Sequence, residues 1–270
     1  MLLLLKLVLS PSLVALVTLA GRRWGTRASG MIASLPVSTG PILLFFALEQ
    51  GSTFASHAAV GALAGLVATA AYFLAFGWVA MRHGWIPSLL AGTLAYAGVT
   101  TLMMGLPLGA EAALLAAMAS FAIVHQLLPR DQGPVAAAAG VSRFDLPLRM
   151  LAAVCITLTL TGLAQWLGPQ LSGLLTPFPV ATSVIASFTL AQQGRTGALA
   201  FIRALNGTMY GFCVFCYVVA LALDTQYSLS IAAAFALALV LQMVAGTGIH
   251  FATGRITGLI RKRPQRRSTP

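Results

Sequence analysis

Long apolar segments, separated by short polar or glycine-containing stretches, recur along the whole chain. An α-helix needs about 20 apolar residues, at 1.5 Å per residue, to cross the hydrocarbon core of a bilayer. Segments of about that length are predicted at 2–20, 30–48, 57–80, 86–104, 110–128, 147–167, 172–192, 198–222 and 227–250. The pattern therefore predicts an all-α integral membrane protein with about nine transmembrane helices.

Charged positions between these predicted spans follow one rule. With the N-terminus outside, the loops predicted to be inside contain Arg22, Arg23, Arg27, Arg82, Arg130, Arg143 and Arg195. The loops predicted to be outside carry Glu49, Glu111 and Asp224 near their edges and no Lys or Arg. Cytoplasmic loops of membrane proteins are enriched in Lys and Arg. The charges therefore predict an outside N-terminus and an inside C-terminus.

One predicted span contains helix breakers. Residues 29–53 read SGMIASLPVSTGPILLFFALEQGST, and residues 172–196 read SGLLTPFPVATSVIASFTLAQQGRT. Aligned without gaps at an offset of 143, they are identical at ten of 25 positions. The identities include proline, glutamine and glycine, which apolar low-complexity sequence does not repeat easily. The chain is therefore predicted to contain a duplicated unit of about four helices.

The two copies are predicted to have opposite orientations in the membrane. The first unit covers 1–105 and the second covers 147–254. Between them, 106–146 contains a linking helix and a cytoplasmic loop, and 255–270 forms a basic cytoplasmic tail. The linking helix reverses the side from which the second unit enters. Inverted repeats about an axis in the membrane plane are common in secondary transporters.

Prolines are predicted to break the second and seventh helices near mid-depth, at Pro36, Pro41, Pro177 and Pro179. Proline lacks the N–H that the helix needs, and unpaired backbone in a membrane must find partners in protein or water. Two half-helices would then begin near the midplane, with Ser38 or Thr39 as one N-cap and Pro41 at the first helical position. Thr182 and Ser183 are expected to serve similarly in the second copy. The simpler alternative is that these prolines only kink packed helices.

The positive N-terminal ends of such half-helices suit an anionic or zwitterionic solute. The residues predicted to bind it are Ser38, Thr39, Gly40, Thr182, Ser183 and Asn206. Thr39 and Thr182 should lie close together around a shared cavity. For Asn206, hydrogen bonding between helices is the favoured alternative. Glu49 and His250 are the candidates for proton coupling.

Two pairs of polar residues at span ends are related by the same offset. Lys6 and Glu49 share the outer membrane edge, where they could pair, and their copies Arg149 and Gln192 share the inner edge.

Composition agrees with a membrane protein: 59% of residues are hydrophobic and 8% are charged, against about 25% charged in soluble domains. Six of the basic residues behind the net charge of +11 lie in 255–270. This charge is expected to contact anionic lipid headgroups, not nucleic acid. The three cysteines, all in apolar segments, indicate packing. Neither a metal site nor a cofactor is expected.

These features favour a small-molecule transporter that works by alternating access. A channel or a noncatalytic membrane subunit is the alternative. A membrane-embedded enzyme is less favoured, because the chain has only five acidic residues and no nucleophile or phosphate-loop motif. Assembly into a homo-oligomer is left open.

The motifs GRRWG, SG, LPVSTGP and FALEQG follow one another within residues 1–80. This pattern resembles a family of bacterial multi-pass membrane proteins. The resemblance implies a place in the bacterial inner membrane and brings no activity, ligand or mechanism with it.

Overall fold

In a computed structural model of the chain, the described residues are 8, 11–12, 14–16, 18–20, 23–24, 39–106, 108–129, 146–152, 154–155, 177–224 and 229–245. All regular secondary structure within them is α-helical. The named helices are α2 (Thr39–Gln50), α3 (Ser52–Ala80), α4 (Trp85–Met104), α5 (Ala110–Leu127) and α8 (Val180–Ala222). A further helix covers Ile231–Ala245.

Four of these helices, α3, α4, α5 and α8, are long and apolar enough to cross a membrane. With no strand among the described residues, this fits an all-α membrane protein. Predicted spans 57–80, 86–104 and 110–128 correspond to α3, α4 and α5, and 198–222 lies within α8. The remaining predicted spans lie partly outside the described residues, so the number nine stays a prediction.

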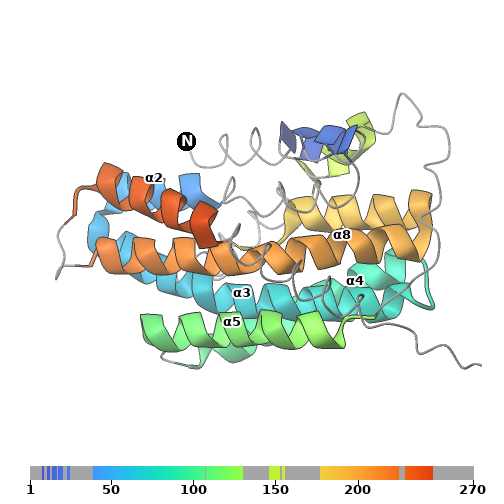
Figure 1. Cartoon of the computed structure of the whole chain (residues 1–270), viewed down its shortest axis with the longest axis horizontal. Helices are drawn as coiled ribbons and strands as arrows, with labels where there is room; N and C mark the ends of the chain where they lie inside the picture. The colour runs from blue at the N-terminus through green and yellow to red at the C-terminus, as the bar shows by residue number, and fades with distance from the viewer. Residues whose placement is uncertain are drawn as a thin grey trace, which may run out of the picture.

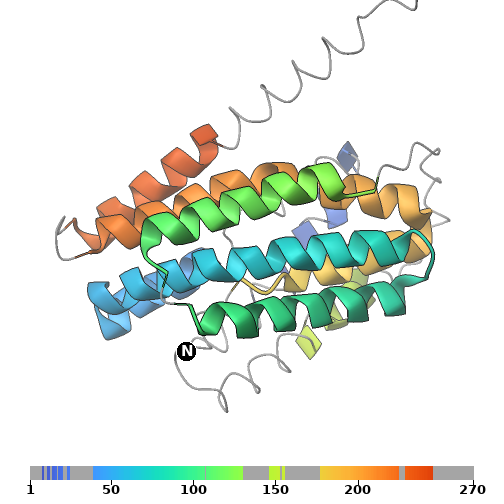
Figure 2. The ribbon, with the colours of Figure 1, turned by 90° about the horizontal axis from the view of Figure 1, so that it is seen from below.

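Helix α3 lies at the centre of the described bundle and contacts α2, α4, α5 and α8 (Figures 1 and 2). The helices α4 and α5 are much less buried than α3. Their outward sides carry large exposed apolar side chains, including Leu90, Leu94, Leu102, Leu115 and Ile123. Such a surface is suited to lipid. Trp78 and Trp85 are exposed where α3 ends and α4 begins, as is typical of residues at a membrane interface.

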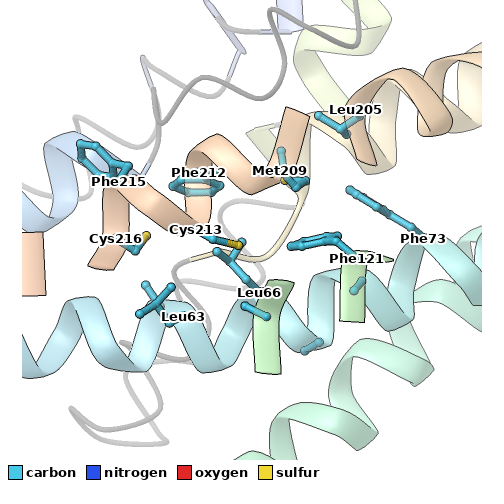
Figure 3. Close-up of a cluster of buried hydrophobic side chains, with 14 of the residues drawn as sticks. Leu63, Leu66, Phe73, Phe121, Leu205, Met209, Phe212, Cys213, Phe215 and Cys216 are labelled. Atoms are coloured by element: carbon cyan, nitrogen blue, oxygen red, sulfur yellow. The ribbon is translucent and has the colours of Figure 1, made fainter. Parts of the chain in front are cut away.

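The apolar core fills the space between α3, α5 and the C-terminal half of α8. Figure 3 shows Leu63 and Leu66 of α3 facing Cys213 and Cys216 of α8. Both cysteines are fully buried and neither forms a disulfide. Their position in the core agrees with the packing role predicted from the sequence.

Two glycines adopt a backbone conformation that other residues rarely reach. Gly51 has φ 91°, and Gly194 has φ 72°. Gly51 separates α2 from α3, and Gly194 interrupts α8 with non-helical dihedral angles. We call 180–193 the short limb of α8 and 195–222 its long limb. The sequence predicted loops at both places, but a single glycine makes each connection, because a positive φ lets one helix stop and another start at once.

The chain turns back sharply at both glycines. Residues eight apart in a straight helix are about 12 Å apart along its axis. Across Gly51, however, the rings of Phe46 and Phe54 have centroids 5.2 Å apart. Across Gly194, a Cβ on Gly197 would lie 3.4 Å from Cγ2 of Thr189. The two pairs stand at equivalent positions, 143 residues apart.

The two reversals lie at opposite ends of the bundle. In Figures 1 and 2, α2 and the start of α3 lie at the left end, whereas the short limb of α8 runs to the right end and the long limb returns. At the Gly51 end, the Ser56 hydroxyl donates to the Ala220 carbonyl over 2.7 Å. At the Gly194 end, the Arg203 guanidinium donates to the carbonyl of Pro129. The short limb of α8 therefore occupies only about half of the bundle length.

Substitution of Gly51 or Gly194 by Ala should lower the free energy of unfolding by about 1–3 kcal/mol, the usual cost of a strained backbone conformation. An added Cβ would meet nothing within 4 Å at either site, so the backbone alone causes the loss. Gly207→Ala is the matched control, because this helical glycine also has open space. Thermal unfolding in detergent measures all three variants. Equal melting temperatures for the three would show that the reversals do not require glycine.

Candidate functional site

The short limb of α8 begins at a proline-rich stretch. Pro179 is its N-cap and supplies no side-chain capping bond. The Ser183 hydroxyl instead donates to the Pro179 carbonyl over 2.8 Å. The Ser183 N–H reaches the same carbonyl, also at 2.8 Å. The expectation that Thr182 and Ser183 would act as N-caps is therefore wrong: the helix already begins at Val180, which puts both hydroxyls inside its first turns.

This helix start lies in the middle of the bundle. The Thr69 hydroxyl donates to the Pro177 carbonyl over 3.1 Å, and Thr69 stands near the middle of α3. The ring of Phe178 meets that of Tyr96 edge-to-face, with centroids 4.9 Å apart, and Tyr96 stands near the middle of α4. Since both helices are long enough to cross a membrane, the break at Pro177 and Pro179 lies far from either end.

Aromatic rings surround the break. Tyr72 of α3 also contacts Phe178, with ring centroids 6.3 Å apart, and stacks on Phe76 at 5.9 Å. Gly92 of α4 makes room for Tyr72, because a Cβ at this position would lie 2.7 Å from Cε2 of the ring. Phe178 is thus held between two tyrosines, and Gly92 lets α4 approach closely enough to hold them.

One buried hydroxyl beside this helix start lacks a regular hydrogen bond. The Tyr72 hydroxyl faces the side chain of Ser183 but makes no regular hydrogen bond. The Ser187 hydroxyl, two turns into the short limb, is also without a partner. A buried polar group without a partner costs about 1–3 kcal/mol. The Tyr72 hydroxyl beside the helix start marks the region as a candidate binding site. Sequence reasoning missed Tyr72, because a tyrosine in an apolar helix gives no sign of an unpaired hydroxyl.

The described part of α2 starts at Thr39, directly after residues that lie outside the described ranges. Thr39 and Gly40 are buried, and Pro41 follows them in α2. Where the helix break of this copy lies stays a prediction. Pro36 and Ser38 lie outside the described residues. Thr182 is buried as well, and its closeness to Thr39 stays a prediction.

Asn206 joins two helices. Its side-chain amide donates to the Phe121 carbonyl of α5 over 3.2 Å, and both residues are buried. The hydrogen bond between helices, favoured from the sequence, is thus present. The other side-chain atom, Oδ1, has no partner, so a further role in binding stays a prediction.

Arg149 and Gln192, which the repeat placed at one membrane edge, contact each other. The Arg149 guanidinium donates to Oε1 of Gln192 over 2.8 Å and lies 4.7 Å from the ring centre of Phe188. Arg149 is only 4% exposed. The contact attaches the helical segment around Arg149 to the short limb of α8. Lys6 lies outside the described residues.

Of the proton-coupling candidates, Glu49 lies in the last turn of α2 and His250 lies outside the described residues.

Within the described part of the chain, no three His, Cys, Asp or Glu residues are grouped as a metal site would require.

Comparison with known proteins gave no match to a family model, a curated protein or a solved structure. Any functional assignment for this chain therefore comes from its own residues and geometry.

Gly92→Ala should lower the free energy of unfolding by about 1–3 kcal/mol, the usual cost of overpacking a buried site. The new methyl group would displace the Tyr72 ring, which is fully buried. Gly98→Ala on the same helix is the matched control, since a Cβ there meets nothing within 4 Å. Thermal unfolding in detergent compares the two. If Gly92→Ala and Gly98→Ala have the same melting temperature, Tyr72 does not pack against α4 as described.

Proposed function

We propose that this chain is a multi-pass membrane transporter that moves a small anionic or zwitterionic solute by alternating access. The observation that carries the proposal is the short limb of α8, which follows a proline-containing stretch, begins in the middle of the bundle and reverses at Gly194. At the opposite end, α2 reverses at Gly51, the equivalent position of the repeat. Broken helices with their N-terminal ends at mid-depth are a recurring way to bind solutes in transporters.

An inverted repeat accounts for this arrangement. The α2–Gly51–α3 hairpin and the two limbs of α8 joined at Gly194 have the same construction in opposite directions. The two glycines stand 143 positions apart, which is the offset of the sequence repeat. This agreement supports two inverted units, 1–105 and 147–254, within about nine spans. In such a design the two units exchange roles when the transporter changes the side to which it opens.

The charges at the two ends support an orientation. Arg82 lies just after α3, and Arg195 follows Gly194, both at the same end. Glu111 in the first turn of α5 and Asp224 after α8 lie at the opposite end. By the positive-inside rule, the Gly194 end faces the cytoplasm. The basic tail 255–270 would then meet anionic lipid on that side of the bacterial inner membrane.

Impermeant maleimide labelling should place the two reversals on opposite sides. Ser52 and Arg195 are equivalent in the repeat, and both are exposed. In a variant whose native cysteines are replaced, Ser52→Cys should react in intact cells. Arg195→Cys should react only after the membrane is opened. Labelling of both residues from one side would exclude an inverted repeat and overturn this part of the proposal.

Uptake by purified protein in proteoliposomes tests the function itself. Thr39→Ala and Thr182→Ala should each reduce uptake of labelled carboxylates or amino acids about tenfold or more, since a hydrogen bond to a charged group contributes about 1.5–3 kcal/mol. Pro179→Ala should also reduce uptake, because alanine can continue a helix through the position where proline ends it. Thr101→Ala is the control, because its exposed hydroxyl donates only to Ala97 within α4.

Three results would contradict transport by alternating access. The first is that no labelled solute crosses the bilayer, and the second is that all three site variants behave like Thr101→Ala. The third is a flux that neither saturates nor shows exchange across the membrane, which would identify a channel instead.

A further inference from the structure

We propose that the start of α8 binds the carboxylate of an apolar monocarboxylate, with the Tyr72 hydroxyl as a donor and the rings of Phe178 and Tyr96 against its apolar part. Tyr72 is fully buried, so a solute reaches it only when the bundle opens. This inference therefore rests on the proposed transport function. It assigns a class of solute and a binding residue, Tyr72, that the sequence repeat does not indicate.

The acceptors at this helix start are already filled. Thr69 donates to the Pro177 carbonyl, the Val180 N–H donates to the Phe178 carbonyl, and Ser183 donates to the Pro179 carbonyl. The Pro179 carbonyl also accepts the first hydrogen bond of the helix, from the Ser183 N–H, at 2.8 Å. A cation or another donor would therefore find little to bind here.

Donors remain at the same place. The Val180 N–H is already paired, but the next N–H groups, those of Ala181 and Thr182, have no partner within the helix, and Pro179 supplies no side-chain cap. The Tyr72 hydroxyl faces Ser183, one turn into the helix, and makes no regular hydrogen bond. A group that accepts several hydrogen bonds and donates none fits this set, and a carboxylate is such a group. The positive end of the helix dipole also favours its charge.

The surroundings limit the rest of the solute. The α3 segment from Ser52 to Ala80 and the α4 segment from Trp85 to Met104 contain no Lys, Arg, Asp or Glu. A second charge on the solute would have no opposite charge on these helices and would be costly to bury. The rings of Phe178, Tyr96, Tyr72 and Phe76 offer an apolar, aromatic wall instead. One carboxylate with an apolar remainder is the solute that this site fits.

Thermal unfolding of the purified chain in detergent tests the inference with four probes: acetate, propionate, benzoate and phenylacetate. Benzamide serves as the uncharged counterpart of benzoate, and sodium chloride as the salt control. At least one carboxylate should raise the melting temperature in a saturable way, with benzoate or phenylacetate acting at lower concentration than acetate. Benzamide should have no comparable effect.

Tyr72→Phe separates binding from structure. Because the hydroxyl is unpaired, its removal should leave the ligand-free melting temperature unchanged or raise it. The same change should weaken the carboxylate effect about tenfold, the usual effect of losing a hydrogen bond to a charged group. Tyr217→Phe on the long limb is the control and should keep the full effect.

The inference is overturned if no carboxylate stabilises the wild-type chain, or if Tyr72→Phe responds to carboxylates as the wild type does. A lower ligand-free melting temperature in Tyr72→Phe would also overturn it, because the hydroxyl would then be structural. These failures differ from failure of the transport proposal. A chain that moves other solutes but ignores carboxylates loses only the inference. A chain that binds benzoate but transports nothing loses the proposed function and keeps the site.

Discussion

A helix that begins in the middle of a membrane protein leaves backbone N–H and C=O groups that hydrocarbon cannot satisfy. The start of α8 meets this constraint through its neighbours. Thr69 reaches across from α3 to the Pro177 carbonyl, and Ser183 bonds back to Pro179. Tyr72 and Tyr96 enclose Phe178 between them. The central position of α3 follows from this need, because a half-length helix is stable at this depth only if longer helices enclose its open end.

The same constraint explains the distribution of small residues. Helices can approach closely around the break only where a residue such as glycine has no side chain, and Gly92 is the clearest case. Gly77 allows a similarly close contact near the C-terminal end of α3, where a Cβ would lie 2.6 Å from Cδ1 of Leu128. The lipid-facing sides of α4 and α5 have no such need and carry large leucines. Helix association in membranes depends on this kind of close packing, because burial of apolar surface gives little gain in lipid.

The sequence predicted the class of fold and the break at Pro177 and Pro179, because proline, glycine and membrane-length apolar runs act locally. The break at Pro36 and Pro41 stays a prediction. It also placed Arg149 and Gln192 at one edge, since the repeat carries positional information. It did not predict that Gly51 and Gly194 alone would make the reversals, although both were among the repeated residues. A glycine in a loop gives the same sequence pattern whatever its φ. The role of Tyr72 was beyond prediction for another reason: whether a hydroxyl is paired depends on the α8 turn that packs against it, more than 100 positions away.

The one-residue connections also limit how the protein can move. A hinge is a short segment that absorbs large changes in backbone dihedral angles, and a single glycine between two packed helices leaves little length for that. Phe46 against Phe54 further ties α2 to α3, and the close approach of Gly197 to Gln193 does the same for the limbs of α8. Each hairpin is therefore held as one packed unit. In the proposed alternating access, the centre would open by whole hairpins tilting or sliding against each other.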